Sequence, residues 1–227
     1  MVDFRGLRGT CNFYFVRHGE SEGNRDRIIQ GCAPSRLTEK GREQAREAGE
    51  WFRTRALDAV LTSPLARAEE TARIIAEAAG VADIFVAEEL IELDTGIFTG
   101  MSFEEAQRRF PVEYESFRRE SWEAVPEAER IQALLARAGR AWNRAFALAG
   151  EGMRNVLSVT HSGFLQWILK SSLGGASWMP LLAASDNCCI SHLRVSNGEQ
   201  GGGEGGYLAS WMLVNAPPCV DGGIAGR

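Results

Sequence analysis

Four short runs of apolar and β-branched residues predict buried strands. They are CNFYFV at 11–16, LDAVLTS at 57–63, NVLSVT at 155–160 and the weaker run DIFVAEEL at 83–90. Runs of this length bounded by polar or Gly-containing segments are typical of strands in a sheet that is covered on both faces. The polar segment RHGESEGNRDRIIQGCAPSR, after the first run, predicts a loop with room for one helical turn.

Two helices are predicted between the first three strands. Thr38 caps one that runs to about Arg55, because the apolar residues after it recur at helical spacing. The second reads SPLARAEETARIIAEAAG: Ser63 is its expected cap, Pro64 takes its first position and Gly80 ends it.

Two more helical segments flank the fourth strand. Residues 102–149 are charged and alanine-rich and are predicted to be wholly helical, with breaks at Pro111 and Pro126. We expect them to form a helical insertion that lies over the carboxyl ends of the strands as a partial lid. The mostly apolar stretch 162–174 predicts a buried helix.

The end of the chain has a different pattern. CISHLRV at 189–195 and YLASWMLV at 207–214 alternate like two strands of a β-hairpin, joined by the Gly-rich segment 196–206, which we expect to be a mobile tip. Strands alternating with helices predict an α/β fold: a three-layer α/β/α domain with a mainly parallel sheet and a C-terminal β-hairpin. No linker or repeat divides residues 1–227, so a single domain is expected.

Composition narrows the class of protein. The 227 residues are 44% hydrophobic and 24% charged, with a net charge of −5, so no broad basic surface for nucleic acid is expected. No apolar run approaches a membrane span, and no membrane partner is expected. Five cysteines without a C-x-x-C motif are untypical of a disulfide-stapled secreted domain and favour a cytoplasmic protein. The adjacent Cys188 and Cys189 are interpreted as strand residues rather than a redox pair.

Basic residues follow three of the predicted strands. The first runs into Arg17 and His18, the second is followed within one helical turn by Arg67, and the fourth runs into His161. Ligands of open α/β sheets bind outside the carboxyl ends of the strands. If these strands are parallel neighbours, the four side chains meet at one edge, where their chemistry suits an oxyanion.

Other interpretations of these residues are less favourable. A lone arginine in a first helical turn more often pairs with a surface glutamate. Arg67 is interpreted as an anion ligand because Arg17, His18 and His161 also follow predicted strands. A metal site built from His18, His161 and a carboxylate is disfavoured, because two arginines would surround the cation and no closely spaced ligand pair is present. The third histidine, His192, lies within an alternating strand and is expected to be structural.

Four separated motifs carry a family resemblance. VRHGESEGN with LTEKGREQA, then TSPLARAEETA, then ELIELDTGIFTGMSFEE, and finally VTHSG resemble the histidine phosphatase (phosphoglycerate mutase-like) superfamily over about residues 13 to 170. The resemblance implies metal-independent phosphoryl transfer with no cofactor, acting on a small phosphorylated substrate.

The resemblance also implies residue roles. His18 would be the nucleophile that forms a phosphohistidine, and His161 would neutralise the transferring phosphoryl group. Arg17 and Arg67 would hold the phosphoryl oxygens, and Glu92 would donate the proton to the leaving group. The expected substrate-binding residues are the remaining motif positions: Ser21, Asn24, Gln30, Gly31, Ser162 and Gly163.

Departures from the family pattern favour a phosphatase over a mutase. Cofactor-dependent mutases usually carry a tyrosine three residues after the acidic donor, where this chain has Thr95, and a proline-rich stretch in the insertion, which is missing here. A phosphomonoester hydrolase is therefore the first hypothesis, a phosphoglycerate mutase the second, and a non-catalytic phosphate-recognition module the third.

The sequence allows more than one role for several residues. Aromatic side chains of the insertion line the leaving-group side or form an ordinary core: Phe103, Phe110, Tyr114, Phe117 and Trp122. Arg108 or Arg118 would reach a substrate carboxylate, and Arg36 is either a second anion ligand or solvated. Cys32, near the site in sequence, is a candidate for oxidation. The strand ISHLRV is a candidate edge for a homodimer, although nothing requires one.

Overall fold

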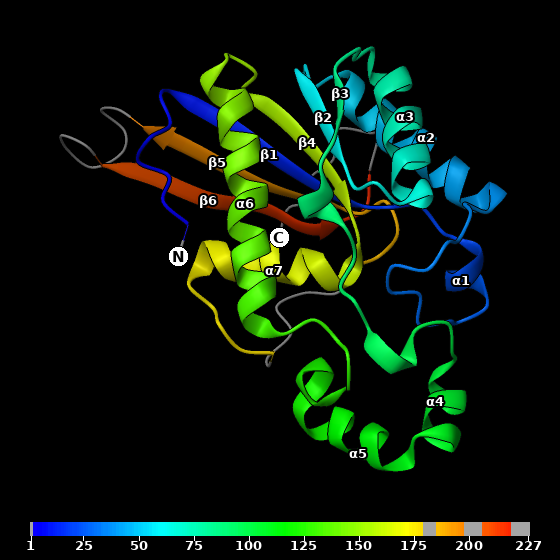
Figure 1. The fold of residues 1–227 in the computed structure, drawn as a ribbon. Helices are drawn as coiled ribbons and strands as arrows, with labels where there is room; N and C mark the ends of the chain where they lie inside the picture. Colours follow the sequence, from blue (N-terminus) through cyan, green and yellow to red (C-terminus); the bar gives the residue numbers. More distant parts are fainter. Residues whose placement is uncertain (1, 179–184, 198–205, 219–227) are drawn as a thin grey trace, which may run out of the picture.

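The computed structural model describes residues 2–178, 185–197 and 206–218. Within them, a six-stranded sheet has the order β3-β2-β4-β1-β5-β6 (Figure 1). Its strands, in chain order, are β1 (Thr10–Arg17), β2 (Ala59–Thr62), β3 (Ile84–Val86), β4 (Asn155–Thr160), β5 (Ile190–Asn197) and β6 (Tyr207–Ala216). Most of the expected mobile tip, and Cys219, lie outside the described residues.

The four strands β3, β2, β4 and β1 run parallel, which confirms the mainly parallel sheet. In the register, Arg17 of β1 lies opposite Thr160 of β4, and Thr62 of β2 lies opposite Val159. The carboxyl ends of these three neighbours therefore stand level at one edge. The backbone N–H of His18 extends the pairing by donating to the carbonyl of Thr160 at 2.9 Å.

The C-terminal hairpin is confirmed, since β5 is antiparallel to both β1 and β6. Because β5 is paired on both sides, the prediction that its ISHLRV segment forms a dimerising edge is wrong. β3 and β6 are the outermost strands in the sheet order.

Helices cover both faces of the sheet, as the three-layer prediction required. On one face α2 (Glu39–Arg53) and α3 (Ala66–Ala79) bury side chains such as Phe52 and Ile75 against Val16, Val60 and Val159. On the other face, α6 (Ile131–Gly150) and α7 (Ser162–Leu173) pack onto the sheet around the fully buried Trp142 and Trp167. Within the described residues, no helix combines the length and the apolar character needed to cross a membrane.

The helical segment 102–149 divides into two parts. In Figure 1, α6 crosses the face of the sheet, whereas α4 (Phe103–Arg109) and α5 (Pro111–Glu120) lie below it. The part that stands apart is thus α4, α5 and the 3₁₀ turn η3 (Ser121–Ala124), shorter than the expected insertion. The break at Pro111 is confirmed, with Pro111 opening α5.

The aromatic side chains of this insertion make a small core of their own. Phe98, in the 3₁₀ turn η2 (Gly96–Phe98), is fully buried and lies 5.9–6.3 Å from four aromatic rings, measured between centroids. These rings belong to Phe110, Tyr114, Phe117 and Trp122. The ordinary-core interpretation therefore holds for them. Phe103 stacks on Phe117 but stays 46% exposed.

Three local predictions need correction. The third strand is only Ile84–Val86, because residues Glu88–Leu90 form the 3₁₀ turn η1. Helix α3 begins at Ala66 with Leu65 as its N-cap, so Ser63 is not its cap. Cys188 and Cys189 precede β5 in a turn rather than lying in the strand, and Cys188 is buried.

Candidate active site

The expected strand-end cluster forms. His18 and His161 directly follow the adjacent parallel strands β1 and β4, and their rings lie 5.0 Å apart between centroids. Arg67, the second residue of α3, donates from Nε to Nε2 of His18 at 3.3 Å. All three side chains are at most 2% exposed. The topology alone brings together residues that are far apart in sequence.

The hydrogen bonds of His18 define its tautomer. Nδ1 lies 2.7 Å from the carbonyl oxygen of Gly19, which only accepts, so Nδ1 carries the proton. Nε2 then keeps a lone pair, which accepts the N–H of Arg67. Burial, followed by the charges of Arg17 and Arg67, holds the pKa of His18 well below its usual value. His18 is therefore a neutral imidazole at neutral pH, with its lone pair on Nε2.

His161 is held by Ser63, the residue expected from the sequence to cap α3. Its Nε2 lies 2.7 Å from Oγ of Ser63, the residue after β2. The Ser63 hydroxyl also accepts the backbone N–H of Leu65 at 3.3 Å, which leaves one proton and one lone pair for its contact with His161. Nδ1 of His161 is buried without a partner among the described residues. Burial and the neighbouring His18, Arg67 and Arg17 hold the pKa of His161 well below its usual value.

Arg67 and Arg17 make different contacts. Arg67 donates to the carbonyls of Ala33 at 2.9 Å and Gly31 at 2.7 Å, so it ties the loop after α1 (Glu22–Arg25) to His18. Arg17 donates from Nη1 to the carbonyl of Ser185, while its Nε is buried without a partner among the described residues. Burial lowers the pKa of both arginines, and the nearby charge of Glu92 opposes this in each.

Glu92 lies at the amino end of α7. Its carboxylate accepts the backbone N–H groups of Leu93 at 2.8 Å, Gly163 at 3.3 Å and Phe164 at 2.9 Å. The first N–H groups of a helix have no partner within the helix, and they favour an anion. A Cβ on Gly163 would lie 2.7 Å from Oε1 of Glu92, so glycine is what lets the carboxylate approach. Gly163 thus makes room for the Glu92 carboxylate. Ser162 is the first residue of α7.

The remaining predicted residues belong to the loop after β1 and form a network of hydrogen bonds within it. Ser21 is the N-cap of α1, and its hydroxyl lies 3.0 Å from Oδ1 of Asn24 and 2.9 Å from Oε1 of Gln30. Oδ1 of Asn24 also accepts the backbone N–H of Ser21 and an N–H of Asn187, which leaves the NH₂ end of Asn24 facing away from these partners. Gly31 has φ of +47° and places its carbonyl on Arg67.

The structure adds polar residues that sequence reasoning missed. Ser63 ends a strand just as Arg17 and His161 do, so the strand-end argument could have found it. Asn187 donates to the backbone carbonyl of His18 at 2.8 Å, and no pattern in the sequence marks it. Arg137 is a buried arginine on α6 whose position on the apolar face of the helix was a usable signal.

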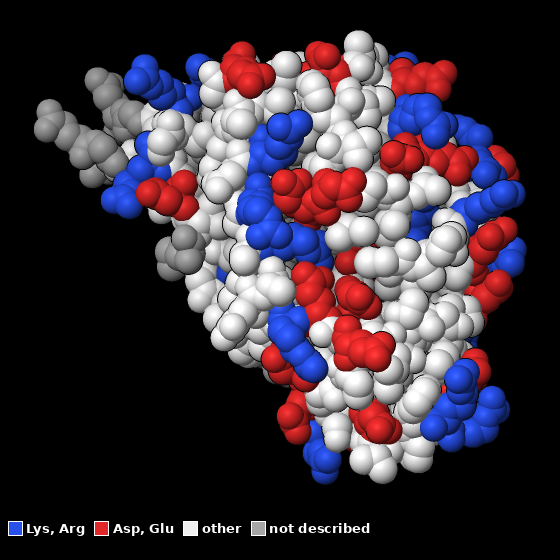
Figure 2. All heavy atoms as spheres, in the orientation of Figure 1, with Lys and Arg blue, Asp and Glu red and all other residues white. Residues whose placement is uncertain are grey.

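The cation Arg67 of this site is buried rather than part of a basic patch on the surface. Figure 2 shows basic and acidic side chains interspersed over the face drawn, while Arg67 lies inside with 1% exposure. Arg36 is exposed, consistent with the solvated interpretation. Cys32 is half-buried with its Sγ 3.5 Å from the carbonyl of Glu92, and burial raises the pKa of its thiol, which disfavours the reactive thiolate. Within the described ranges, no group of three His, Cys, Asp or Glu side chains is arranged to hold a metal.

Comparisons with known proteins extend over this whole site. The family model of the histidine phosphatase superfamily (branch 1) matches residues 13–201. A protein of Enterobacter sp. (strain 638) described as a probable phosphoglycerate mutase, GpmB, is 36% identical over 207 residues, which are 88% of this chain and 89% of that protein.

Two solved structures share the fold. The α-ribazole phosphatase from Shigella flexneri has a TM-score of 0.76 and 24% identity, with 91% of this chain and 96% of that chain covered. A mycobacterial glucosyl-3-phosphoglycerate phosphatase, in complex with VO₃, has a TM-score of 0.74 and 22% identity, with 91% and 99% covered.

Proposed function

The chain belongs to the histidine phosphatase superfamily, and on that premise we propose that it is a phosphomonoester hydrolase acting on a small phosphorylated metabolite. The reaction runs through a phosphohistidine at His18 and needs no metal ion. The charge that a metal would supply comes from Arg17, Arg67 and the N–H donors around them. The cysteine usage favours the cytoplasm as the place where it works.

One observation carries this proposal: two buried nitrogens, Nε of Arg17 and Nδ1 of His161, have no partner among the described residues. Buried polar groups are nearly always hydrogen-bonded, and each exception calls for a reason. These two come from the neighbouring ends of β1 and β4, the strands that His18 and His161 follow. The proposal is that a phosphoryl group at Nε2 of His18 offers its equatorial oxygens to both, with His161 in the tautomer protonated on Nδ1, and that the NH₂ group of Asn24 is a third donor.

The proposed chemistry balances in two steps. In the first, the lone pair of His18 Nε2 attacks phosphorus, the P–O bond to the leaving group breaks, and Glu92 in its acid form gives its proton to the departing oxygen. In the second, the Glu92 carboxylate takes a proton from water, the water oxygen attacks phosphorus, and the P–N bond breaks with its electron pair returning to Nε2. The products are an alcohol and inorganic phosphate.

A phosphoglycerate mutase is the second candidate, favoured by the relative described as a probable mutase. The surroundings of Thr95 favour a phosphatase instead. Its hydroxyl lies 2.7 Å from that of Thr99 and 2.5 Å from where a Cβ on Gly31 would stand, so the position is filled and supplies no phenol to the site. A coupled assay for mutase activity, with and without a bisphosphate primer, separates the two: primer-dependent isomerisation would replace the first proposal by the second.

The direct test is a panel of small phosphate monoesters, assayed in EDTA with the wild type and His18→Ala. We expect phosphate release by the wild type that EDTA leaves unchanged, and at least a 10³-fold loss in His18→Ala. Rapid quenching in base, where a phosphoramidate survives, should trap one phosphoryl group on the wild type and none on the variant. Folded wild-type protein that hydrolyses no member of a broad panel would overturn the proposal.

A further inference from the structure

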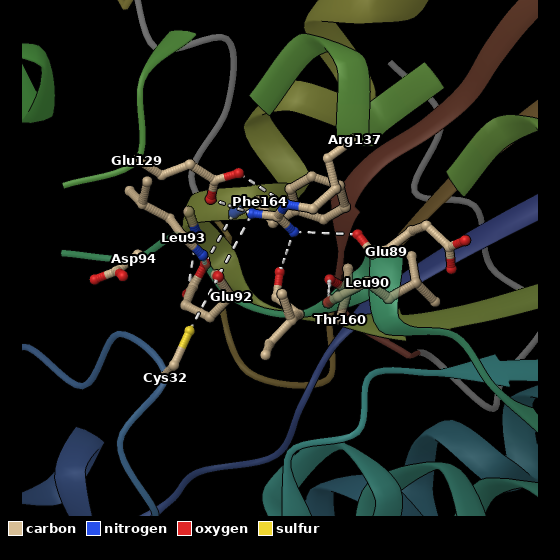
Figure 3. Close-up of polar contacts among 12 residues, drawn as sticks. Cys32, Glu89, Leu90, Glu92, Leu93, Asp94, Glu129, Arg137, Thr160 and Phe164 are labelled. Carbon is tan, nitrogen blue, oxygen red and sulfur yellow. Dashed lines mark hydrogen bonds and ion pairs between the residues drawn. The ribbon is translucent and has the colours of Figure 1, made fainter. Parts of the chain in front are cut away.

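Arg137 of α6 is buried beside the segment that carries Glu92, and the strand-end site does not use it. It is buried, and its guanidinium forms a two-point ion pair with Glu129, from Nε to Oε1 at 2.9 Å and from Nη2 to Oε2 at 2.5 Å. Both side chains are largely buried, at 8% and 17% exposure. Figure 3 shows the guanidinium of Arg137 between Glu129 on one side and Glu89 on the other.

The guanidinium also binds the backbone on either side of Glu92. Nη1 donates to the carbonyls of Glu89 at 3.1 Å and Ile91 at 2.5 Å, and Nη2 lies 3.5 Å from the carbonyl of Glu92. This segment is neither strand nor α-helix, so its carbonyls have no ladder partners of their own. A single side chain therefore fixes three of its carbonyls.

Neighbouring contacts complete this support. Oγ1 of Thr160, the last residue of β4, donates to the carbonyl of Leu90 at 2.7 Å. The backbone N–H of Glu129 donates to the carbonyl of Asp94 at 3.0 Å. The backbone that carries Glu92 is thus anchored to β4, to α6 and to the turn before α6.

The same guanidinium contacts the helix that receives the Glu92 carboxylate. Its Cζ lies 3.9 Å from the centre of the Phe164 ring, and the backbone N–H of Phe164 donates to Oε1 of Glu92. A cation over an aromatic face is attracted by the ring. Arg137 thereby links the two elements whose relative position sets where the carboxylate lies.

Glu129 explains why this cation does not capture Glu92 itself. A buried guanidinium without a partner would favour a fork with a neighbouring carboxylate, and pairing with Glu92 would remove that carboxylate from the reacting group. Glu129 occupies Nε and Nη2, so Arg137 meets Glu92 only at its backbone carbonyl.

We infer that Arg137, held by Glu129, is a positioning residue that fixes Glu92 for proton transfer to the leaving group. The inference rests on the proposed role of Glu92 as the acid. Proton donation matters most for a poor leaving group and least for one that leaves readily as an anion. Loss of the Arg137 contacts should therefore make the rate depend more steeply on the leaving group.

The test uses Arg137→Lys and Glu129→Gln, with Arg140→Lys as the matched control on an exposed position of the same helix. kcat/KM is measured with p-nitrophenyl phosphate and with glycerol 2-phosphate, which has an alkoxide leaving group. We expect both variants to lose about 10- to 100-fold with the alkyl substrate and less than about 3-fold with the aryl one. Arg140→Lys should change neither. Equal losses with both substrates, or no loss, would overturn the inference.

Amide hydrogen exchange tests the same claim without relying on activity. The N–H groups of Gly163 and Phe164 belong to the first turn of α7, where Glu92 is their partner. Their exchange, and that of Leu93, should accelerate in Arg137→Lys relative to amides of β1. If the wild type hydrolyses no phosphate ester, the proposed function fails and exchange alone decides: unchanged protection of these three amides would refute the positioning role.

Discussion

Oγ of Ser63 lies 2.7 Å from Nε2 of His161, although the two residues are 98 positions apart. In the tautomer that the proposed function requires, the hydroxyl donates its proton to Nε2 while it accepts the N–H of Leu65. Nδ1 of His161 then carries the proton and has no protein partner among the described residues. A serine at one strand end thus holds the imidazole of a histidine at the next strand end.

Ser63→Ala should weaken the reaction more than it weakens the fold. Without the hydroxyl, His161 loses the contact that fixes its tautomer and ring orientation, so we expect kcat to fall about 10- to 100-fold. Ser63→Thr keeps a hydroxyl and should retain more activity than Ser63→Ala. Nitrogen NMR of the imidazoles reports the tautomer directly. A Ser63→Ala protein with wild-type kcat and an unchanged His161 tautomer would contradict this role.

Gly163→Ala separates helix stability from the placement of Glu92. Alanine is favoured over glycine by about 1 kcal/mol inside a helix, but its Cβ here would lie 2.7 Å from Oε1 of Glu92. The carboxylate has to move, so we expect at least a 10-fold loss of kcat/KM with an alkyl phosphate. The melting temperature should stay within a few degrees of the wild type.

Gly139→Ala is the matched control for this change. It lies within α6, and its added Cβ would meet nothing within 4 Å. The same glycine-to-alanine gain in helix propensity should therefore come with unchanged activity. Equal effects of the two substitutions on the rate would mean that the contact between Gly163 and Glu92 is not what matters.

The sequence predicted the strand-end cluster because it follows from topology. Once the strands are parallel neighbours, Arg17, His18 and His161 must meet at one edge, and the register puts Arg17 opposite Thr160. The contacts made by Ser63 could not be predicted, since Ser-Pro before an alanine-rich helix has the local pattern of a cap. Its actual partner lies on a distant segment and leaves no periodic signal.

The ends of the third strand and the packing of the insertion could not be predicted from the sequence either. Ile84 and Val86 are 38% and 50% exposed because β3 is an outermost strand, so no buried alternation marked its ends. Residues 102–149 share one helical composition, yet Leu134 and Trp142 bury against the sheet while Phe117 packs on Phe98. Composition predicts a helix, whereas which core it joins depends on tertiary contacts.

The nucleophile should stay unprotonated well into the acidic range. Burial and the charges of Arg17 and Arg67 lower the pKa of His18 well below the ordinary value of 6.5. Protonation removes the lone pair on Nε2, so activity is present above the lowered pKa and is lost as pH falls through it. We expect the acid limb of kcat/KM to lie well below pH 6.5, after correction for the second pKa of about 6 of the phosphate ester itself.

Proton NMR of the His18 ring provides a check that is free of the substrate. Its resonances should not titrate between pH 7.5 and pH 6, where an ordinary histidine changes its protonation. Arg17→Gln removes one of the two cations that depress the pKa, so it should move the titration upward. A His18 midpoint near pH 6.5 in the wild type would contradict the prediction.

His192 should make the free energy of unfolding depend on pH in the acidic range, without affecting the reaction rate. Its ring stacks on Tyr14 at 4.4 Å, and its Nε2 lies 2.9 Å from Oδ1 of Asn12. Burial, then the charges of Arg194 and Arg55, lower its pKa to about 4. Above pH 6.5 the imidazole is neutral in both the folded and the unfolded chain, so His192 adds no pH dependence there.

Below pH 6.5 the unfolded chain binds a proton at this position and the folded chain does not. Stability therefore falls as pH decreases, by about 1.4 kcal/mol per pH unit for this one group, until the folded pKa is reached. Between pH 6.5 and pH 5.0 the contribution of His192 is about 2 kcal/mol. Lowered pKa values at His18 and His161 act in the same direction and persist in a His192 variant.

Urea unfolding of the wild type and His192→Gln at pH 7.5 and pH 5.0 isolates this share. Glutamine keeps an N–H donor for Asn12 but carries no titratable group. The variant should be less stable at pH 7.5, because it loses the stacking on Tyr14, yet its drop in unfolding free energy on going to pH 5.0 should be about 2 kcal/mol smaller. Equal drops in the two proteins would show that His192 takes up its proton as readily in the folded chain as in the unfolded one.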